Sequence, residues 1–188
     1  ETFIGETGAY DWNFGHVAPQ GLAIDNAGRF YVSDNWAARI QVFDSNGAFL
    51  TSIEGNNSAS LGYPIGIGVD QNGNIHVAIR ENHAIQIFSP GIDDWMQSNI
   101  NGFWDKTNAQ IPALASFKDH FYAGTWKYDG DLGGEIVSSA EVWRTADGIA
   151  WEKVDSRLVN GCAHMIEYDG YLYCGSWDGR IWRTANGT

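Results

Sequence analysis

The chain has 188 residues, of which 44% are hydrophobic, and a net charge of −12 from 11 basic and 23 acidic side chains. This composition supplies a packed core and is far from that of a disordered chain. Binding to a phosphate backbone depends on cations, and no Lys/Arg cluster is present, so we expect neither nucleic acid nor an anionic membrane surface as a partner. No run of about 18 apolar residues occurs, and we therefore expect no membrane insertion.

Short alternating segments, many of them closed by a Gly-containing turn, recur along the whole chain, as β-hairpins require. No segment has a long helical period. In chain order the predicted strands are 21–25, 29–34, 39–47, 48–54, 66–70, 74–79, 84–91, 95–100, 113–117, 120–125, 141–148, 151–156, 164–168, 171–176 and 180–187.

The strands group into four antiparallel units that recur about every 45–50 residues, which is typical of β-propeller blades. We therefore expect an all-β fold, a single propeller domain with four blades of four strands. The expected blades are about 20–55, 64–100, 112–156, and 163–188 together with 1–6.

The last unit lacks its fourth strand, whereas the segment "ETFIGETG" at residues 1–8 resembles a fourth strand with nothing before it. We expect Thr2–Glu6, with Phe3 and Ile4 at its centre, to pair with the strand that holds Arg180, Ile181 and Trp182. The pairing would close the ring within one molecule, or complete a neighbouring chain's blade by strand addition. A longer propeller cut at both ends is the alternative that the sequence leaves open.

The first half resembles NHL repeats, through "PQGLAIDNAGRFYVSDNWAARIQVFDSNGAFLTSIEG" (19–55) and a weaker copy at 64–90. The second half resembles Asp-box repeats of the BNR type, through Thr145, Asp147, Gly148 and Trp151, with a hybrid unit at 64–100 between the two. Both resemblances imply a propeller, and neither fixes a function. The Asp-box resemblance implies structural roles: Asp147 accepting hydrogen bonds from turn amides, Gly148 supplying a permissive backbone, and Trp151 packing under the turn.

Aromatic residues gather on the segments expected at one face of the propeller. Trp36, Trp126 and Trp177 each follow the second strand of a unit, and the connections between units add further rings on that face: Tyr10, Trp12, Tyr63, Phe103 and Trp104. An aromatic rim with few cations suits a neutral ligand, such as a sugar ring or an apolar protein patch. Rings that only pack between blades are the alternative interpretation.

Catalytic motifs are weak. The arginine cluster expected of a sialidase is missing, and the five histidines share no repeat position and show no zinc spacing. Asp129 and Asp131, in "YDGDLGG" at 128–134, are weak calcium candidates. We therefore expect no cofactor apart from that calcium alternative, and no catalytic residues.

The expected function is a non-catalytic binding, adhesion or assembly module that recognises protein or glycan and self-associates into oligomers or filaments. A carbohydrate-active or lyase-type enzyme is the alternative. The chain opens at Glu1 without Met or a signal peptide, as a processed, exported protein or an excised fragment would. We expect a secreted or cell-surface location.

The two cysteines leave their redox state open. The hairpin around "YDG" would set Cys174 opposite Met165 and place Cys162 on the other strand face. A disulfide would then need a bulge or a distortion.

Overall fold

In the computed structural model, the described residues are 19–55, 61–89, 95–99, 101–105, 107–127, 140–158 and 161–188. They form fifteen β-strands and the short 3₁₀ helix η1 (Asn101–Trp104). The strands are, in chain order, β1 (Pro19–Ile24), β2 (Phe30–Asp34), β3 (Arg39–Phe43), β4 (Phe49–Glu54), β5 (Pro64–Val69), β6 (Ile75–Ile79), β7 (Ala84–Phe88), β8 (Trp95–Gln97), β9 (Asn108–Phe117), β10 (His120–Lys127), β11 (Ala140–Thr145), β12 (Glu152–Leu158), β13 (Cys162–Tyr168), β14 (Tyr171–Ser176) and β15 (Ile181–Thr184).

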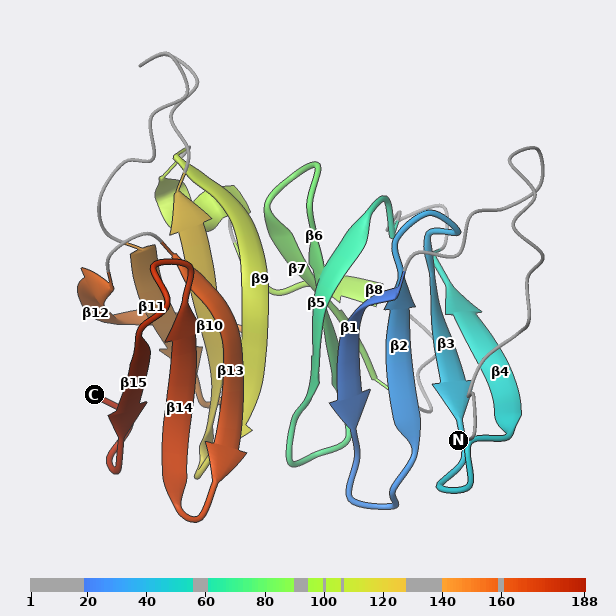
Figure 1. Ribbon diagram of the computed structural model, residues 1–188. Helices are drawn as coiled ribbons and strands as arrows, with labels where there is room; N and C mark the ends of the chain where they lie inside the picture. Colours follow the sequence, from blue (N-terminus) through green and yellow to red (C-terminus); the bar gives the residue numbers. More distant parts are fainter. Residues whose placement is uncertain are drawn as a thin grey trace.

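The strands build four antiparallel sheets, β1–β4, β5–β8, β9–β12 and β13–β15, each paired in sequence order. These sheets are the blades of a β-propeller, numbered 1 to 4 here, and the prediction of an all-β fold with four blades is confirmed (Figure 1). Blades 1 to 3 have four strands each, and blade 4 has three among the described residues. The segment predicted to complete blade 4, Thr2–Glu6, lies outside the described residues.

Three of the hairpin turns are fixed by the same local chemistry. Asp25, Asp44 and Asp70 each accept hydrogen bonds from the backbone N–H groups two and four residues later, at 2.8–2.9 Å. A glycine with positive φ follows three residues after each aspartate. The side chain thus satisfies turn amides that the sheet leaves unpaired, and this explains why "DNAG", "DSNG" and "DQNG" end strands.

The core lies between neighbouring blades. The innermost strands stand side by side, β1 beside β5, β5 beside β9, and β9 beside β13 (Figure 1). The third strands of the first three blades bury an aliphatic residue at the same repeat position against the next blade: Ile40 and Ile85 are fully buried, and Val142 is 9% exposed. The alternation within each strand therefore determines which face each blade turns toward its neighbour.

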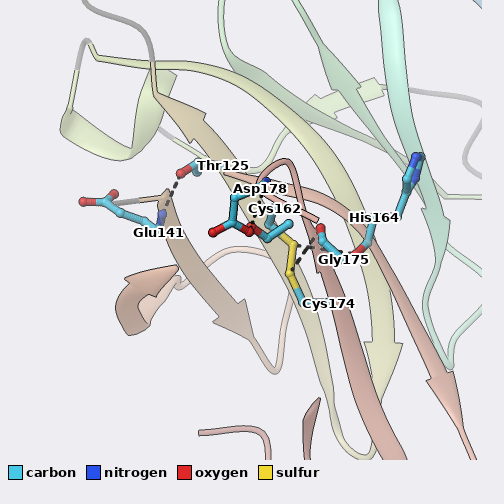
Figure 2. The surroundings of a disulfide bond; sticks show 8 residues. Thr125, Glu141, Cys162, His164, Cys174, Gly175 and Asp178 are labelled. Carbon is cyan, nitrogen blue, oxygen red and sulfur yellow. Dashed lines mark hydrogen bonds between the residues drawn. A yellow bond between two sulfur atoms is a disulfide. The ribbon is translucent and has the colours of Figure 1, made fainter. Parts of the chain in front are cut away.

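A disulfide joins Cys162 and Cys174 within blade 4 (Figure 2). As the sequence predicts, Met165 lies opposite Cys174. A register shift between Cys162 and His164 leaves Ala163 as an extra residue, which turns Cys162 to the face that Cys174 occupies. The bulge that a disulfide would need is therefore present, and the two cysteines are bonded.

The turn after β11 has the hydrogen bonds that the Asp-box resemblance implies. Asp147 Oδ1 accepts from the N–H groups of Ile149 and Ala150, both at 2.8 Å. Gly148 has φ +77°. Trp151 donates its indole N–H to Ser98 Oγ at 2.9 Å, and its ring lies edge-on to Phe103. The turn therefore attaches blade 3 to blade 2.

Candidate functional site

A cavity of about 940 Å³ lies where blades 1, 2 and 3 converge. The first strand of a blade begins at the same end at which the second strand finishes, because the two are antiparallel. This end therefore gathers the segments that follow β2, β6 and β10 together with the starts of β1, β5 and β9. Three of the aromatic residues singled out in the sequence line this one cavity: Trp36, Tyr63 and Trp126.

The tryptophan rings near this end of the propeller differ in their exposure to solvent. Trp36 is 61% exposed in the turn after β2, whereas Trp126 is partly buried near the end of β10. Trp177, in the turn after β14, is also 61% exposed and does not line the cavity. Trp177 nevertheless lies close to Trp126, since both rings lie against Gly161. A Cβ added to Gly161 would be 2.6 Å from Trp126 Cδ1 and 2.9 Å from Trp177 Cδ1. The aromatic surface thus continues from the cavity toward blade 4.

Charged residues also line the cavity, which the sequence reasoning missed. Arg80 and Glu81 follow β6, and Arg80 occupies in blade 2 the repeat position of Trp126 in blade 3 and Trp177 in blade 4. Alignment of these turns would have revealed them. Glu81 Oε2 accepts the Tyr63 N–H at 2.8 Å, so the carboxylate also fixes the start of β5. The site therefore combines stacking surfaces with one cation and one anion.

Residues with amide and imidazole groups complete the lining. They are Gln20, Asn35, His83 and Gln110. Asn35 Nδ2 also donates to the Pro64 carbonyl at 3.3 Å and so joins blade 1 to blade 2. Amides and an imidazole offer donors and acceptors together, and this mixture suits a ligand with several hydroxyl groups.

A buried carboxylate supports the strand that carries Trp126. The Glu141 side chain is 6% exposed, and its backbone N–H donates to Thr125 Oγ1 at 2.9 Å. Its two carboxylate oxygens accept hydrogen bonds from Asn108, Trp143, Lys127 and Lys153. Thr125 directly precedes Trp126, so this network holds the end of β10 in place next to Trp126.

The charges within this network are balanced. Lys127 Nζ donates to Glu141 Oε1 at 3.1 Å and to Asp105 Oδ2 at 2.7 Å. Burial alone raises the pKa of Glu141, but hydrogen bonds from Lys153, Asn108 and Lys127 outweigh it, and the pKa is lowered. Burial likewise opposes ionisation of Asp105, yet hydrogen bonds from Lys127 and Thr107 lower its pKa to about 2. Both carboxylates are therefore charged at neutral pH.

Other predicted site residues lie elsewhere. Trp104, in η1, is 66% exposed and lines a separate depression with Phe103, Ile149 and Trp151. Both Phe103 and Trp104 have positive φ angles, and neither residue lines the cavity between blades 1, 2 and 3. Trp12, Asp129 and Asp131 lie outside the described residues.

The histidines that the structure describes are dispersed. His76 is fully buried, stacks on Phe121 at 4.0 Å and lies 3.1 Å from Asp70 Oδ2, an arrangement that packs blade 2 against blade 3. His164 is exposed on β13, and His83 lines the cavity. Within the described ranges, no three His, Cys, Asp or Glu side chains are grouped closely enough to hold a metal ion.

No helix in the described part of the chain is both long and apolar enough to cross a bilayer.

Sequence and structure comparisons agree on the class of fold. The family model for the NHL repeat matches residues 18–43, so the chain carries at least one NHL-like repeat in a β-propeller. No curated protein matches the chain.

Solved structures resemble the chain at low identity. The computationally designed Ika4 protein is 14% identical with a TM-score of 0.58, over 98% of this chain and 97% of that one. Virginiamycin B lyase from Staphylococcus aureus, crystallised with quinupristin, is 14% identical with a TM-score of 0.65, over 98% of this chain and 59% of that one. A chain of the nidogen/laminin complex is 14% identical with a TM-score of 0.61, over 89% of this chain and 76% of that one. The chain thus spans less than two thirds of the lyase, and these similarities define the fold alone.

Proposed function

We propose that this propeller is a non-catalytic binding module whose cavity between blades 1, 2 and 3 holds a hydroxyl-rich ligand, a glycan in the first instance. The observation that carries the proposal is the convergence of Trp36, Tyr63 and Trp126 on one cavity. Indole and phenol faces stack on the apolar faces of sugar rings, and the amides of Gln20 and Gln110 supply hydrogen bonds to hydroxyl groups.

The charged pair refines the expected ligand. Arg80 and Glu81 lie side by side in the sequence and line the same cavity, so their charges offset each other. A neutral glycan, or one with a single carboxylate that pairs with Arg80, is therefore favoured over a polyanion. The net charge of −12 also opposes polyanionic ligands.

A secreted or cell-surface location is part of the proposal. Disulfides persist in oxidising compartments and are rare in reducing ones, and the Cys162–Cys174 bond supports such a location. Adhesion and assembly roles fit this setting, and one of the similar structures is a chain of a nidogen/laminin complex.

An enzyme is the second candidate, because Glu81 and His83 bring a carboxylate and an imidazole to the same cavity. One of the similar structures is a lyase. The Glu81 carboxylate already accepts the Tyr63 N–H, however, and this bond suits a structural role better than proton transfer.

A glycan array tests the ligand. The full chain is expected to bind a restricted set of neutral or mono-acidic glycans, and the double variant Trp36→Ala/Trp126→Ala is expected to lose them. A full chain that binds no glycan on the array would refute the glycan assignment. Turnover of a bound glycan would favour the enzyme.

A further inference from the structure

Two apolar blade faces are not covered by any other described part of the chain, and one lies at each end of the row of blades. Among the described strands, β1 and β13 do not pack against each other as β1 packs against β5 and β9 packs against β13. On β1, Leu22 is 62% and Ile24 56% exposed. On blade 4, Ile181 is 78% exposed. In Figure 1 blade 1 and blade 4 lie at opposite sides of the molecule.

The residues on these faces occupy positions that every inner interface buries. Ile181 has the repeat position of Ile40, Ile85 and Val142, which are 0%, 0% and 9% exposed against the next blade. Leu22 has the repeat position of Ile67, which is 5% exposed against the preceding blade. Blade 4 thus presents the surface that receives a following blade, and blade 1 presents the surface that packs on a preceding one.

The connections between blades give a second, independent observation. The outermost strand of each blade directly precedes the innermost strand of the next, as β4 precedes β5, β8 precedes β9 and β12 precedes β13. The predicted strand Thr2–Glu6 stands in the same relation to β1. It belongs by this order to a blade that precedes blade 1, and blade 4 is the described blade without a fourth strand.

We propose that a second copy of this chain packs its blade 1 face, Leu22 and Ile24, on the blade 4 face around Ile181, and adds its own Thr2–Glu6 to the edge of β15. This names the partner for the assembly role proposed above and uses a surface separate from the ligand cavity. One association thereby covers both the exposed face and the unpaired strand edge, by the same contacts that hold the inner blades together.

The edge also has room for a large side chain from the added strand. A cavity of about 240 Å³ lies beside β15, lined by Val142, Val154, Met165, Leu172 and Trp182 among others. In blade 3 the Trp151 ring packs under the corresponding turn against blade 2. Thr2–Glu6 contains one residue with a side chain of that size, Phe3.

Light scattering on the full chain, coupled to size-exclusion chromatography, tests the proposal. The wild type is expected to have at least twice the monomer mass at micromolar concentration. Leu22→Asp and Ile181→Asp are each expected to be monomeric. Ile149→Asp changes an isoleucine that is 63% exposed, close to the 62% of Leu22, in the turn after β11, and is expected to associate like the wild type.

Mixing the two monomeric variants identifies the geometry. A head-to-tail contact uses one face from each copy, so an equimolar mixture of Leu22→Asp and Ile181→Asp retains one intact interface and is expected to form a dimer. Hydrogen exchange is expected to show protection of the β15 amides that do not bond to β14 in the wild type. Ile4→Pro removes a backbone donor from the added strand, and these amides are expected to lose their protection in that variant.

Several results would overturn the proposal. They are a monomeric wild type, self-association of Ile181→Asp on its own, and a mixture of the two variants that stays monomeric. Free exchange in the associated wild type of the β15 amides that do not bond to β14 would also overturn it. Because neither face includes Trp36 or Trp126, glycan binding by a monomer would defeat this proposal alone. A dimer that binds no glycan would defeat only the ligand assignment.

Discussion

Met165 lies directly opposite Cys174 in the β13–β14 hairpin, and Cys162 reaches the same face only because the strand bulges at Ala163. The disulfide therefore depends on one extra residue in β13. It connects two neighbouring strands of blade 4 (Figure 2). Gly124 of blade 3 lies against Cys162. The bond stabilises both the hairpin and the surface that blade 4 offers to blade 3.

Removing the disulfide should lower stability. The two cysteines are 12 residues apart in sequence, and closing a loop of that length constrains the unfolded chain by about 3 kcal/mol. We expect Cys162→Ala/Cys174→Ala to lose free energy of unfolding of roughly this size in denaturant titrations. Reductant should lower the wild-type midpoint toward that of the variant and leave the variant unchanged. Equal midpoints for the oxidised wild type and the variant would contradict this account.

Gly124 should tolerate no side chain, because a Cβ there would lie 2.5 Å from Cys162 Cβ and 2.7 Å from its sulfur. We expect Gly124→Ala to cost about 1–3 kcal/mol through overpacking of the interface between blades 3 and 4. Gly175→Ala is the matched control, since no atom lies within 4 Å of its added Cβ. Chemical denaturation of both variants checks the difference, and equal losses would show that the close contact is not the cause.

The sequence predicts the strands and their pairing well because both depend on local chemistry. Alternation sets the strands, and aspartates such as Asp25 and Asp70 close the turns by bonding to their own amides. The register of Met165 with Cys174 follows from the short turn between them. The bulge at Ala163 could not be predicted, because the short turn sets the register at Met165 but not the register shift beyond His164.

The candidate site was predicted only in part, for a similar reason. Trp36 and Trp126 follow second strands, and the repeat alone places them at one end of the propeller. Trp104 follows an irregular connection with positive φ angles, so its direction depends on the fold of η1 rather than on the repeat. Arg80 is not aromatic, so the pattern of aromatic residues does not include it, although its repeat position, the same as that of Trp126, indicates the cavity.

Substitution of Glu141 should lower the stability of the fold more than substitution of most other polar residues. Its side chain is 6% exposed and accepts hydrogen bonds from four side chains. We expect Glu141→Gln to lower the free energy of unfolding by about 2 kcal/mol, because charge-assisted bonds are lost in a buried setting. Glu152→Gln, at a carboxylate that is 62% exposed in its pair with Arg144, is expected to cost less than about 1 kcal/mol. If the two variants are equally stable, the buried network does not have the role assigned to it.

Acid should weaken the contact between Asp105 and Lys127. The pKa of Asp105 is lowered from 3.8 to about 2 in the folded protein. Ionisation therefore adds stability above pH 3.8, and this contribution is lost as the pH falls toward 2. Asp105 is 36% exposed, so we expect Asp105→Asn to cost less than about 1 kcal/mol at pH 7. The gap from the wild type should close between pH 4 and 2, and a gap that is constant over this range would contradict the assignment.

Isothermal titration with a glycan selected on the array tests the central claim most directly. Trp126→Ala and Trp36→Ala are each expected to weaken binding roughly five- to tenfold, as the loss of about 1 kcal/mol or slightly more from one stacking contact implies. Trp104→Ala removes an indole that is as exposed as that of Trp36 but lies outside the cavity, and it should bind like the wild type. Wild-type affinity in both cavity variants, or an equal loss in Trp104→Ala, would contradict a ligand site between blades 1, 2 and 3.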